Sequence, residues 1–337
     1  MRIMIASYIV CVCALMTLSG CSEPEQPQSE GPRNLDSLLL QFPDSISLLL
    51  ERGNLLFEEY KYDQAMNDAA KAFRLDSTNL KVKLLYAEVL NNREYRTIED
   101  VNIAQQQYDK VVKQDPKNLR ALVGLGATYA FQQAFDKTFQ YVNEALRIDP
   151  RYRDAYVLKG STYRQLGNME LAKSSYETAV QQDPEFFEAY FLLGQIYQSE
   201  SDPVCIEYFT TALELRPHIL EVKYQLAFSK EIHGQLEGAK SIYREMASDT
   251  VDFYVARGLF HQGYIKQFVD DEKDIDSAIY FYNSALATEP RYVEAWHNLG
   301  MCYVSKGSKT EALQSFAKAL KYNPEFELSR IEADRLR

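Results

Sequence analysis

Residues 293–326 read VEAWHNLGMCYVSKGSKTEALQSFAKALKYNPEF. Small and apolar residues recur there at spacings of three and four on both sides of Gly307, the pattern of two amphipathic helices joined by a tight turn. The residues that form this pattern are Trp296, Leu299, Gly300, Tyr303, Gly307, Ala312, Phe316, Ala319 and Pro324. A single helix pair of this kind cannot bury its apolar face alone, so we expect it to stack on copies of itself.

Copies of the pattern can be followed upstream to about residue 46. The small residue of the first helix recurs as Gly53, Ala87, Gly126, Gly160, Gly194, Ala227, Gly263 and Gly300. The corresponding position of the second helix is mostly aromatic and reads Ala69, Tyr108, Val142, Tyr176, Phe209, Tyr243, Tyr282 and Phe316. Small and aromatic residues so placed interlock between adjacent helices. The sequence therefore predicts eight helix pairs, with extra residues inside the second pair (about 91–99) and the seventh (about 268–273).

The 293–326 stretch resembles the tetratricopeptide repeat (TPR) family, whose pattern W-x2-L-G-x2-Y, then A-x3-F, then P it meets at every position. The resemblance implies an all-α fold, a right-handed superhelical solenoid of about eight TPR helix-turn-helix repeats. We expect the repeat array to span residues 46–326. Residues 327–337 turn polar but remain compatible with a helix, and are predicted to form a C-terminal capping helix.

The first twenty residues have the character of an export signal. Arg2 precedes an apolar run over residues 3–18, and the run ends in Leu-Ser-Gly-Cys21. That ending looks like the bacterial lipobox, which implies cleavage before Cys21 and acylation of its thiol. The alternative is an uncleaved membrane helix, since the run approaches the ~20 residues needed to span a bilayer.

Residues 21–45 are expected to join this anchor to the repeats. Residues 22–33 lack large hydrophobic side chains and contain three prolines, which predicts a disordered tether with a reach of ~40 Å. Leu35 to Phe42 is expected to be a short helix that covers the first repeat. Ser22 directly after the anchor implies, by resemblance to other lipoproteins, a bacterial outer-membrane location. The sequence leaves open whether the repeats face the periplasm or the exterior.

Composition excludes several classes of function. Lys and Arg total 37 against 48 Asp and Glu, a formal charge of −11, which is the opposite of what a nucleic-acid-binding protein needs. Catalytic and phosphate-binding motifs are lacking, so we expect no enzyme activity and no cofactor. His261 and His297 fall on neighbouring first helices without further ligands at metal-binding spacing, so no metal site is expected. Cys205 and Cys302 are interpreted as packing thiols.

The resemblance places partner binding on the concave face, which first helices line. In the N-terminal repeats that face would be mixed in character, with Leu50, Asn54, Phe57, Leu84, Glu88 and Asn91. In the C-terminal repeats it would be aromatic, with Phe191, Tyr224, Phe228, Phe260, Tyr264, Phe268, His297 and Met301. Aromatic side chains dominate binding hot spots. Because the seventh repeat contains insertions, the stripe formed by Phe260, Tyr264 and Phe268 could belong to the core instead. Lys81, Arg120, Arg164 and Arg257 are scattered singly, so a clamp for acidic peptide tails is not predicted.

These observations predict a membrane-anchored, non-catalytic lipoprotein of the bacterial cell envelope, acting as a protein–protein interaction scaffold or adaptor. Its partner would be a protein or peptide in the concave groove. A glycan- or solute-binding lipoprotein is the alternative, because aromatic rings also stack on sugars.

Overall fold

The structure is a computed structural model and describes residues 34–93, 95–270 and 273–337. All regular secondary structure in these ranges is helical. The helices are α1 Leu35–Gln41, α2 Ile46–Glu58, α3 Tyr62–Leu75, α4 Leu80–Asn92, α5 Ile98–Gln114, α6 Leu119–Phe131, α7 Phe135–Ile148, α8 Arg153–Gln165, α9 Met169–Gln182, α10 Phe187–Ser199, α11 Cys205–Leu215, α12 Leu220–Ile232, α13 Leu236–Met246, α14 Asp252–Tyr264, η1 Ile265–Val269, α15 Ile275–Thr288, α16 Val293–Ser305, α17 Lys309–Tyr322 and α18 Glu327–Leu336.

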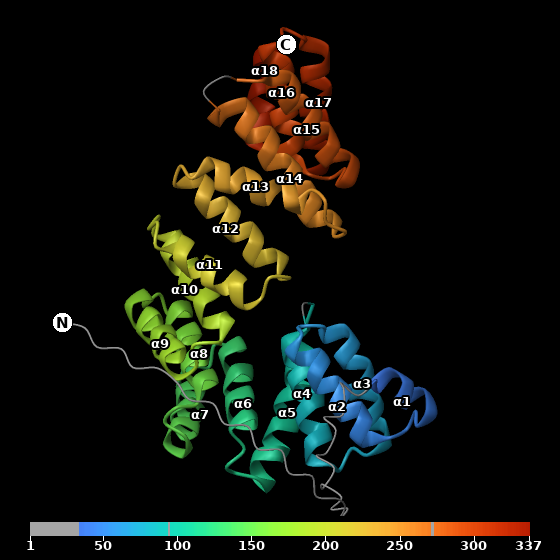
Figure 1. The fold of residues 1–337 in the computed structure, drawn as a ribbon, viewed down its shortest axis with the longest axis vertical. Coiled ribbons are helices and arrows are strands. Elements are labelled where there is room, and N and C mark those ends of the chain that lie inside the picture. The colour runs from blue at the N-terminus through green and yellow to red at the C-terminus, as the bar shows by residue number, and fades with distance from the viewer. Residues whose placement is uncertain (1–33, 94, 271–272) are drawn as a thin grey trace, which may run out of the picture.

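Successive helices pair and stack in chain order. Within the described residues, α2 to α17 form eight helix pairs, each packed on the next, and together they curve into a superhelical solenoid (Figure 1). This confirms the predicted all-α solenoid. The helix α18 packs on α17 at the C-terminal end, where Ala333 and Leu336 join the cluster around Phe316.

The tight turns inside the pairs use a left-handed backbone residue. Gly307, the predicted turn residue, has φ of +72°, and Gly167 and Gly234 have the same conformation in their own repeats. Glycine adopts this region without the steric cost that a side chain imposes. Tyr60, Gln133 and Ser201 occupy the equivalent turns with positive φ although they carry side chains.

The predicted interlock of small and aromatic residues explains how the two helices of a pair approach. A methyl group added at Gly160 would lie 2.6 Å from Cε1 of Tyr176, and one at Gly300 would lie 2.5 Å from Cε1 of Phe316. Both rings are fully buried. Only glycine therefore lets the backbone of the first helix lie directly on the ring. The same arrangement joins Gly194 to Phe209 and Gly263 to Tyr282.

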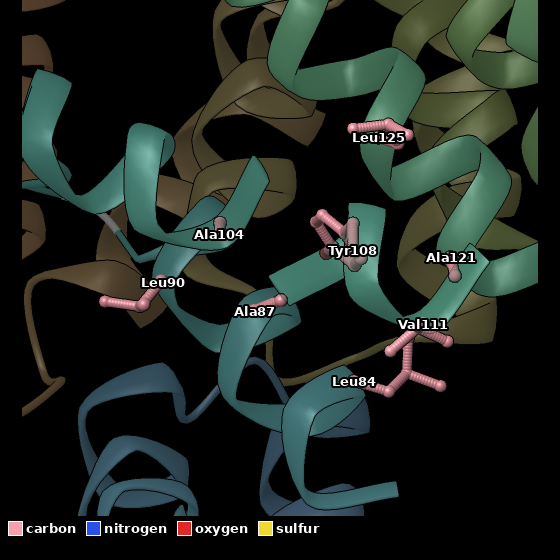
Figure 2. Packing of buried hydrophobic residues seen from close by; sticks show 8 residues of the cluster. All are labelled: Leu84, Ala87, Leu90, Ala104, Tyr108, Val111, Ala121 and Leu125. Carbon is pink, nitrogen blue, oxygen red and sulfur yellow. The ribbon is translucent and has the colours of Figure 1, made fainter. Parts of the chain in front are cut away.

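The second repeat solves this packing problem differently. Its small position is Ala87, and the ring of Tyr108 lies against Gly124 in α6 of the following repeat, where a methyl group would come within 2.4 Å of Cζ. Figure 2 shows Tyr108 of α5 in one cluster with Ala87 of α4 and Leu125 of α6. Gly124 is therefore required by the ring of a preceding helix, although it lies outside the repeating pattern.

The insertion of the seventh repeat is partly absorbed into a helix. α14 continues as the single π-helical turn η1, a rare element that is often found at functional sites. Gln267 in this turn is buried; its side-chain oxygen accepts a hydrogen bond from the Tyr282 hydroxyl at 2.7 Å, and its amide donates to the Asn298 carbonyl at 3.5 Å. These bonds join the π-helical turn to α15 and α16.

A contact between distant repeats closes the N-terminal part of the superhelix. The ring of Tyr60, in the turn after α2, packs edge-on against Phe187 at the start of α10, with centroids 5.3 Å apart. The Tyr60 hydroxyl donates a hydrogen bond to Glu188, which lies 128 residues further along the chain. Burial raises the pKa of Glu188 to about 7. We call this contact between Tyr60, Phe187 and Glu188 the clasp.

The predicted signal peptide, the predicted acylation site Cys21 and the predicted tether of residues 22–33 lie outside the described residues. Among the helices of the described ranges, none combines the length and the apolar character needed to cross a bilayer.

Candidate inner-surface sites

Two groups of side chains on first helices stand out as candidate sites. One is polar and belongs to the first three repeats; the other is aromatic and belongs to the sixth and seventh. Both arise because a first helix presents one face to its own second helix and leaves another face toward the inside of the superhelix.

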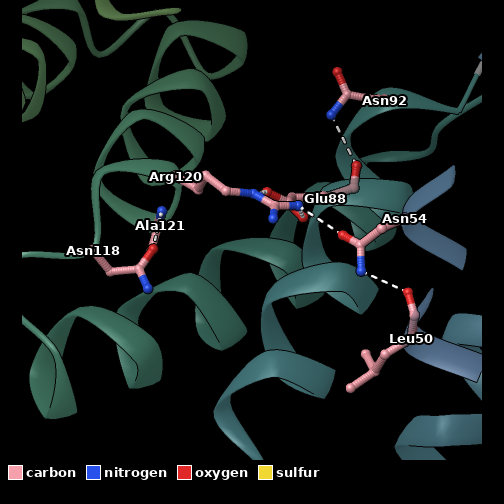
Figure 3. A network of polar contacts seen from close by, with 7 residues as sticks. All are labelled: Leu50, Asn54, Glu88, Asn92, Asn118, Arg120 and Ala121. Carbon is pink, nitrogen blue, oxygen red and sulfur yellow. Dashed lines mark hydrogen bonds and ion pairs between the residues drawn. The ribbon is translucent and has the colours of Figure 1, made fainter. Parts of the chain in front are cut away.

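The polar group is held together by Arg120 of α6. Its guanidinium donates to Glu88 of α4 through Nε to Oε1 at 2.7 Å and through Nη2 to Oε2 at 2.5 Å. Nη2 also donates to Oδ1 of Asn54 in α2 at 3.1 Å. Figure 3 shows the Arg120 side chain extending from α6 toward Glu88 and Asn54. One guanidinium thus links the first helices of three successive repeats.

Glu88 is a buried charge in this group. Its side chain is 9% exposed, whereas that of Arg120 is 47% exposed. Burial raises the pKa of the Glu88 carboxyl, and the charge and hydrogen bonds of Arg120 oppose that rise only in part. The bidentate geometry is that of a strong charge-assisted pair.

The polar group borders a cavity of about 690 Å³. Its lining includes Phe57, Glu88, Asn91, Tyr108, Arg120, Gly124, Tyr152, Arg153, Asp154 and Asp183. A second cavity of about 450 Å³, lined by Leu50, Asn54, Lys81 and Leu84 among others, shares Glu58 and Arg120 with the first. We call the lining of the larger cavity the polar cradle.

The aromatic group is centred on Tyr224 and Phe228, one turn apart on α12. Their rings lie 6.3 Å apart and nearly parallel, at 13°, and both side chains are half-buried. The Tyr224 hydroxyl lies 3.3 Å from Nε2 of His261 on α14. The His261 ring also packs edge-on against both aromatic rings. We call Tyr224 and Phe228 the aromatic pair.

The aromatic pair packs on a buried polar network formed by His261, Glu231 and Tyr243. His261 Nδ1 lies 2.9 Å from Oε2 of Glu231, and the same oxygen accepts a hydrogen bond from the Tyr243 hydroxyl at 2.8 Å. The rings of Tyr243 and His261 stack with centroids 4.7 Å apart. Proximity of the Glu231 carboxylate adds to burial in raising the pKa of Tyr243, so that hydroxyl remains a donor. The sequence analysis did not predict this network. The available signal was Glu231, a charged residue one helical turn after the small, core-facing position Ala227.

The predicted stripe of the seventh repeat divides between core and surface. Phe260 packs on the buried rings of Tyr282 and Tyr292, with centroid distances of 5.6 and 4.8 Å. Tyr264 is half-buried and its ring lies 5.0 Å from that of Phe268, which is 44% exposed. The π-helical turn carries Phe268, so the insertion sets the orientation of this end of the stripe.

The other predicted groove residues lie at separate places along the array. Phe191 packs against Phe209 at 5.8 Å. His297 lies between the rings of Phe316 and Phe326, and its Nδ1 is 3.0 Å from the Ser329 hydroxyl. Burial lowers the pKa of His297. Met301 packs on the cluster that includes α18.

Cys205 and Cys302 are buried free thiols, in agreement with their expected packing role. Burial raises the pKa of the Cys302 thiol to about 12, so this group is not a thiolate nucleophile at neutral pH.

Arg120 is less isolated than its spacing in the sequence suggested. Sequence reasoning placed Asn54 and Glu88 on the inner face but treated Arg120 as a single scattered cation. The structure brings the three together because Arg120 lies in the first turn of α6, directly across from the middle of α4.

Known proteins match parts of this chain. Family models described as tetratricopeptide repeat match residues 93–153 and 293–326, and one described as TPR repeat matches residues 160–200. A relative, the BBSome complex member BBS4 homolog of Drosophila melanogaster, is 28% identical over 138 residues, which cover 37% of this chain and 26% of that protein.

Solved structures share the fold along most of the chain. The Cut9–Hcn1 hetero-tetramer of APC/C matches with a TM-score of 0.60 and 16% identity, over 89% of this chain and 57% of that one. The human IFIT1 dimer with m7Gppp-AAAA matches with a TM-score of 0.57 and 17% identity, over 85% of this chain and 76% of that one. The repeating pattern, the stacked helix pairs and the three family matches identify the chain as a tetratricopeptide repeat protein.

Proposed function

We propose that this protein is a lipid-anchored, non-catalytic scaffold of the bacterial cell envelope, which recruits a partner protein through the aromatic pair. Tetratricopeptide repeats indicate a protein–protein interaction scaffold. Recruitment through the aromatic pair is proposed on one observation. Half-exposed Tyr224 and Phe228 lie together and are held by a buried network of Glu231, Tyr243 and His261.

The support beneath the aromatic pair favours binding. Ordering a side chain at an interface costs ~0.5–1.5 kcal/mol for each group immobilised. His261 contacts both rings and bonds to the Tyr224 hydroxyl, so much of this ordering exists before a partner arrives. Rings held in this way present apolar area at low entropic cost, as in binding hot spots. The excess of acidic residues in the chain favours neutral or basic partners.

The membrane part of the proposal rests on the sequence of the first 21 residues. An acidic protein is not attracted to anionic lipid by its charge, so the acyl chains on Cys21 would supply the membrane affinity. The proline-containing tether would hold the repeats up to ~40 Å from the headgroups.

Affinity capture of the full-length protein, after crosslinking in the cells that make it, tests the aromatic pair. The double variant Tyr224→Ala with Phe228→Ala should lose the captured partner while keeping its helical content and melting temperature. Tyr280→Ala is the matched control, because Tyr280 is 67% exposed on a second helix. Equal capture by the double variant and the wild type would refute the assignment. A saccharide that shifts the melting temperature of the wild type, but not of the double variant, would favour the glycan-binding alternative.

Fractionation of cells that express Cys21→Ser tests the anchor. The variant should move from the membrane to the soluble fraction, because serine lacks the thiol to which the acyl chain would be attached. Retention in the membrane would favour the uncleaved membrane helix.

A further inference from the structure

The polar cradle contains two buried polar side chains without a hydrogen-bond partner among the described residues. Asn91 on α4 is 7% exposed and Tyr108 on α5 is 1% exposed, and both line the 690 Å³ cavity. In the described ranges, the side-chain atoms that have neither a hydrogen-bond partner nor solvent contact belong to His233 and Glu289. The unpartnered polar atoms of Asn91 and Tyr108 are not among them, so they retain some contact with solvent. The Asn91 carboxamide and the Tyr108 hydroxyl therefore reach into the cavity.

Gly124 keeps the Tyr108 hydroxyl open to the cavity. A methyl group at Gly124 would lie 2.8 Å from the hydroxyl oxygen and 2.4 Å from Cζ of the ring. Gly124 itself lines the cavity. The absence of a side chain at this position thus does two things: it lets the ring pass between helices, and it leaves the hydroxyl uncovered.

The charges around the cavity favour a cation. Its lining contains five carboxylates and three guanidinium groups, on Glu58, Glu88, Asp149, Asp154, Asp183, Arg120, Arg151 and Arg153. Arg120 is paired with Glu88, and Arg153 is paired with Asp154 and Asp183. The remaining groups leave an excess of negative charge, in a partly enclosed space where charges interact more strongly than in bulk water.

We propose that the polar cradle is a second binding site, which takes an extended peptide segment with a basic side chain. The Asn91 carboxamide presents an NH2 group that donates and a carbonyl oxygen that accepts, which match the C=O and N–H of a peptide main chain. The Tyr108 hydroxyl supplies a further main-chain hydrogen bond. The carboxylates of the lining receive the basic side chain. A saccharide could use the same hydrogen-bonding groups, but it would leave the excess negative charge without a partner.

The site is separate from the aromatic pair, so the inference goes beyond the proposed function. A phage-displayed library of random nonapeptides, selected on the full-length protein in lipid nanodiscs, identifies a probe. We expect the enriched peptides to carry Lys or Arg. Their affinity, measured by fluorescence anisotropy, should fall about tenfold in Asn91→Ala and in Tyr108→Phe, the loss of roughly one buried hydrogen bond each.

Asn283→Ala is the matched control. Asn283 is exposed on α15, outside the cavity, and its amide donates to the Ile279 carbonyl of its own helix at 2.9 Å, so its removal should leave affinity within about twofold. The variant with Tyr224→Ala and Phe228→Ala should also bind the peptides normally, which separates this site from the proposed function.

Three outcomes would overturn the proposal. The first is that the selection enriches acidic peptides or no peptides. The second is that Asn91→Ala and Tyr108→Phe both bind the peptides with full affinity. The third is that maltoheptaose displaces the peptide and that its own binding also depends on Asn91. The last outcome would assign the cradle to a saccharide.

Discussion

Replacement of Gly124 by alanine should destabilise the array, although alanine is the better helix former. In an unconstrained helix this change stabilises by ~1 kcal/mol. Here the new methyl group would lie 2.4, 2.5 and 2.8 Å from Cζ, Cε1 and the hydroxyl oxygen of the buried Tyr108 ring. Overpacking of this kind costs ~1–3 kcal/mol, and three close contacts place it in the upper part of that range. We therefore expect a net loss of ~1–2 kcal/mol.

The decisive test repeats the change in a Tyr108→Val background, which copies the native Val142 of the third repeat. Without the ring, Gly124→Ala should stabilise by ~1 kcal/mol, giving a coupling energy of ~2–3 kcal/mol between the two sites. Hydrogen exchange of the amides in α4 to α6 is the suitable assay, because a repeat array need not unfold in one step. Stabilisation by Gly124→Ala in both backgrounds would refute the packing argument.

Two charged groups give further predictions. Glu188 in the clasp has its pKa raised by burial from 4.5 to about 7, so its stabilising contribution is complete below pH 4.5 and is lost as the pH rises through 7. The melting temperature should accordingly fall between pH 5 and 8, and Glu188→Gln should remove most of that fall; an unchanged pH profile in the variant would contradict the role of the clasp. Arg120→Ala should cost ~2–4 kcal/mol in local stability, because it leaves the Glu88 carboxylate buried without its cation. Adding Glu88→Gln to Arg120→Ala should restore part of the lost protection of the α4 amides from hydrogen exchange. A further loss of protection in the double variant would contradict this account.

The repeating elements of the fold could be predicted from sequence because their causes are local. The glycine of the turn at Gly307 and the pairing of Gly160 with Tyr176 follow from steric requirements that recur in several repeats. The pairing of Tyr108 with Gly124 could not be read in this way, since it departs from the pattern and joins two different repeats. The clasp joins residues 128 positions apart, and its position depends on the summed curvature of several repeats.

The sites were predictable in part for the same reason. The family pattern indicates which helix face points inward, so Asn54, Glu88 and Tyr224 could be placed on that face. Their partners come from neighbouring helices whose relative rotation the sequence does not state. This is why the hydrogen bond from Arg120 to Glu88, and the bond between His261 and Glu231, emerge only in three dimensions.

Site-specific photocrosslinking tests the central claim most directly. A benzoylphenylalanine in place of Phe228 in the full-length protein, irradiated in the cells that make it, should yield one discrete crosslinked partner protein. The same probe at the exposed outer position Tyr280 should yield none. Identical crosslinking patterns at the two positions, or no adduct at Phe228, would contradict recruitment of a partner by the aromatic pair.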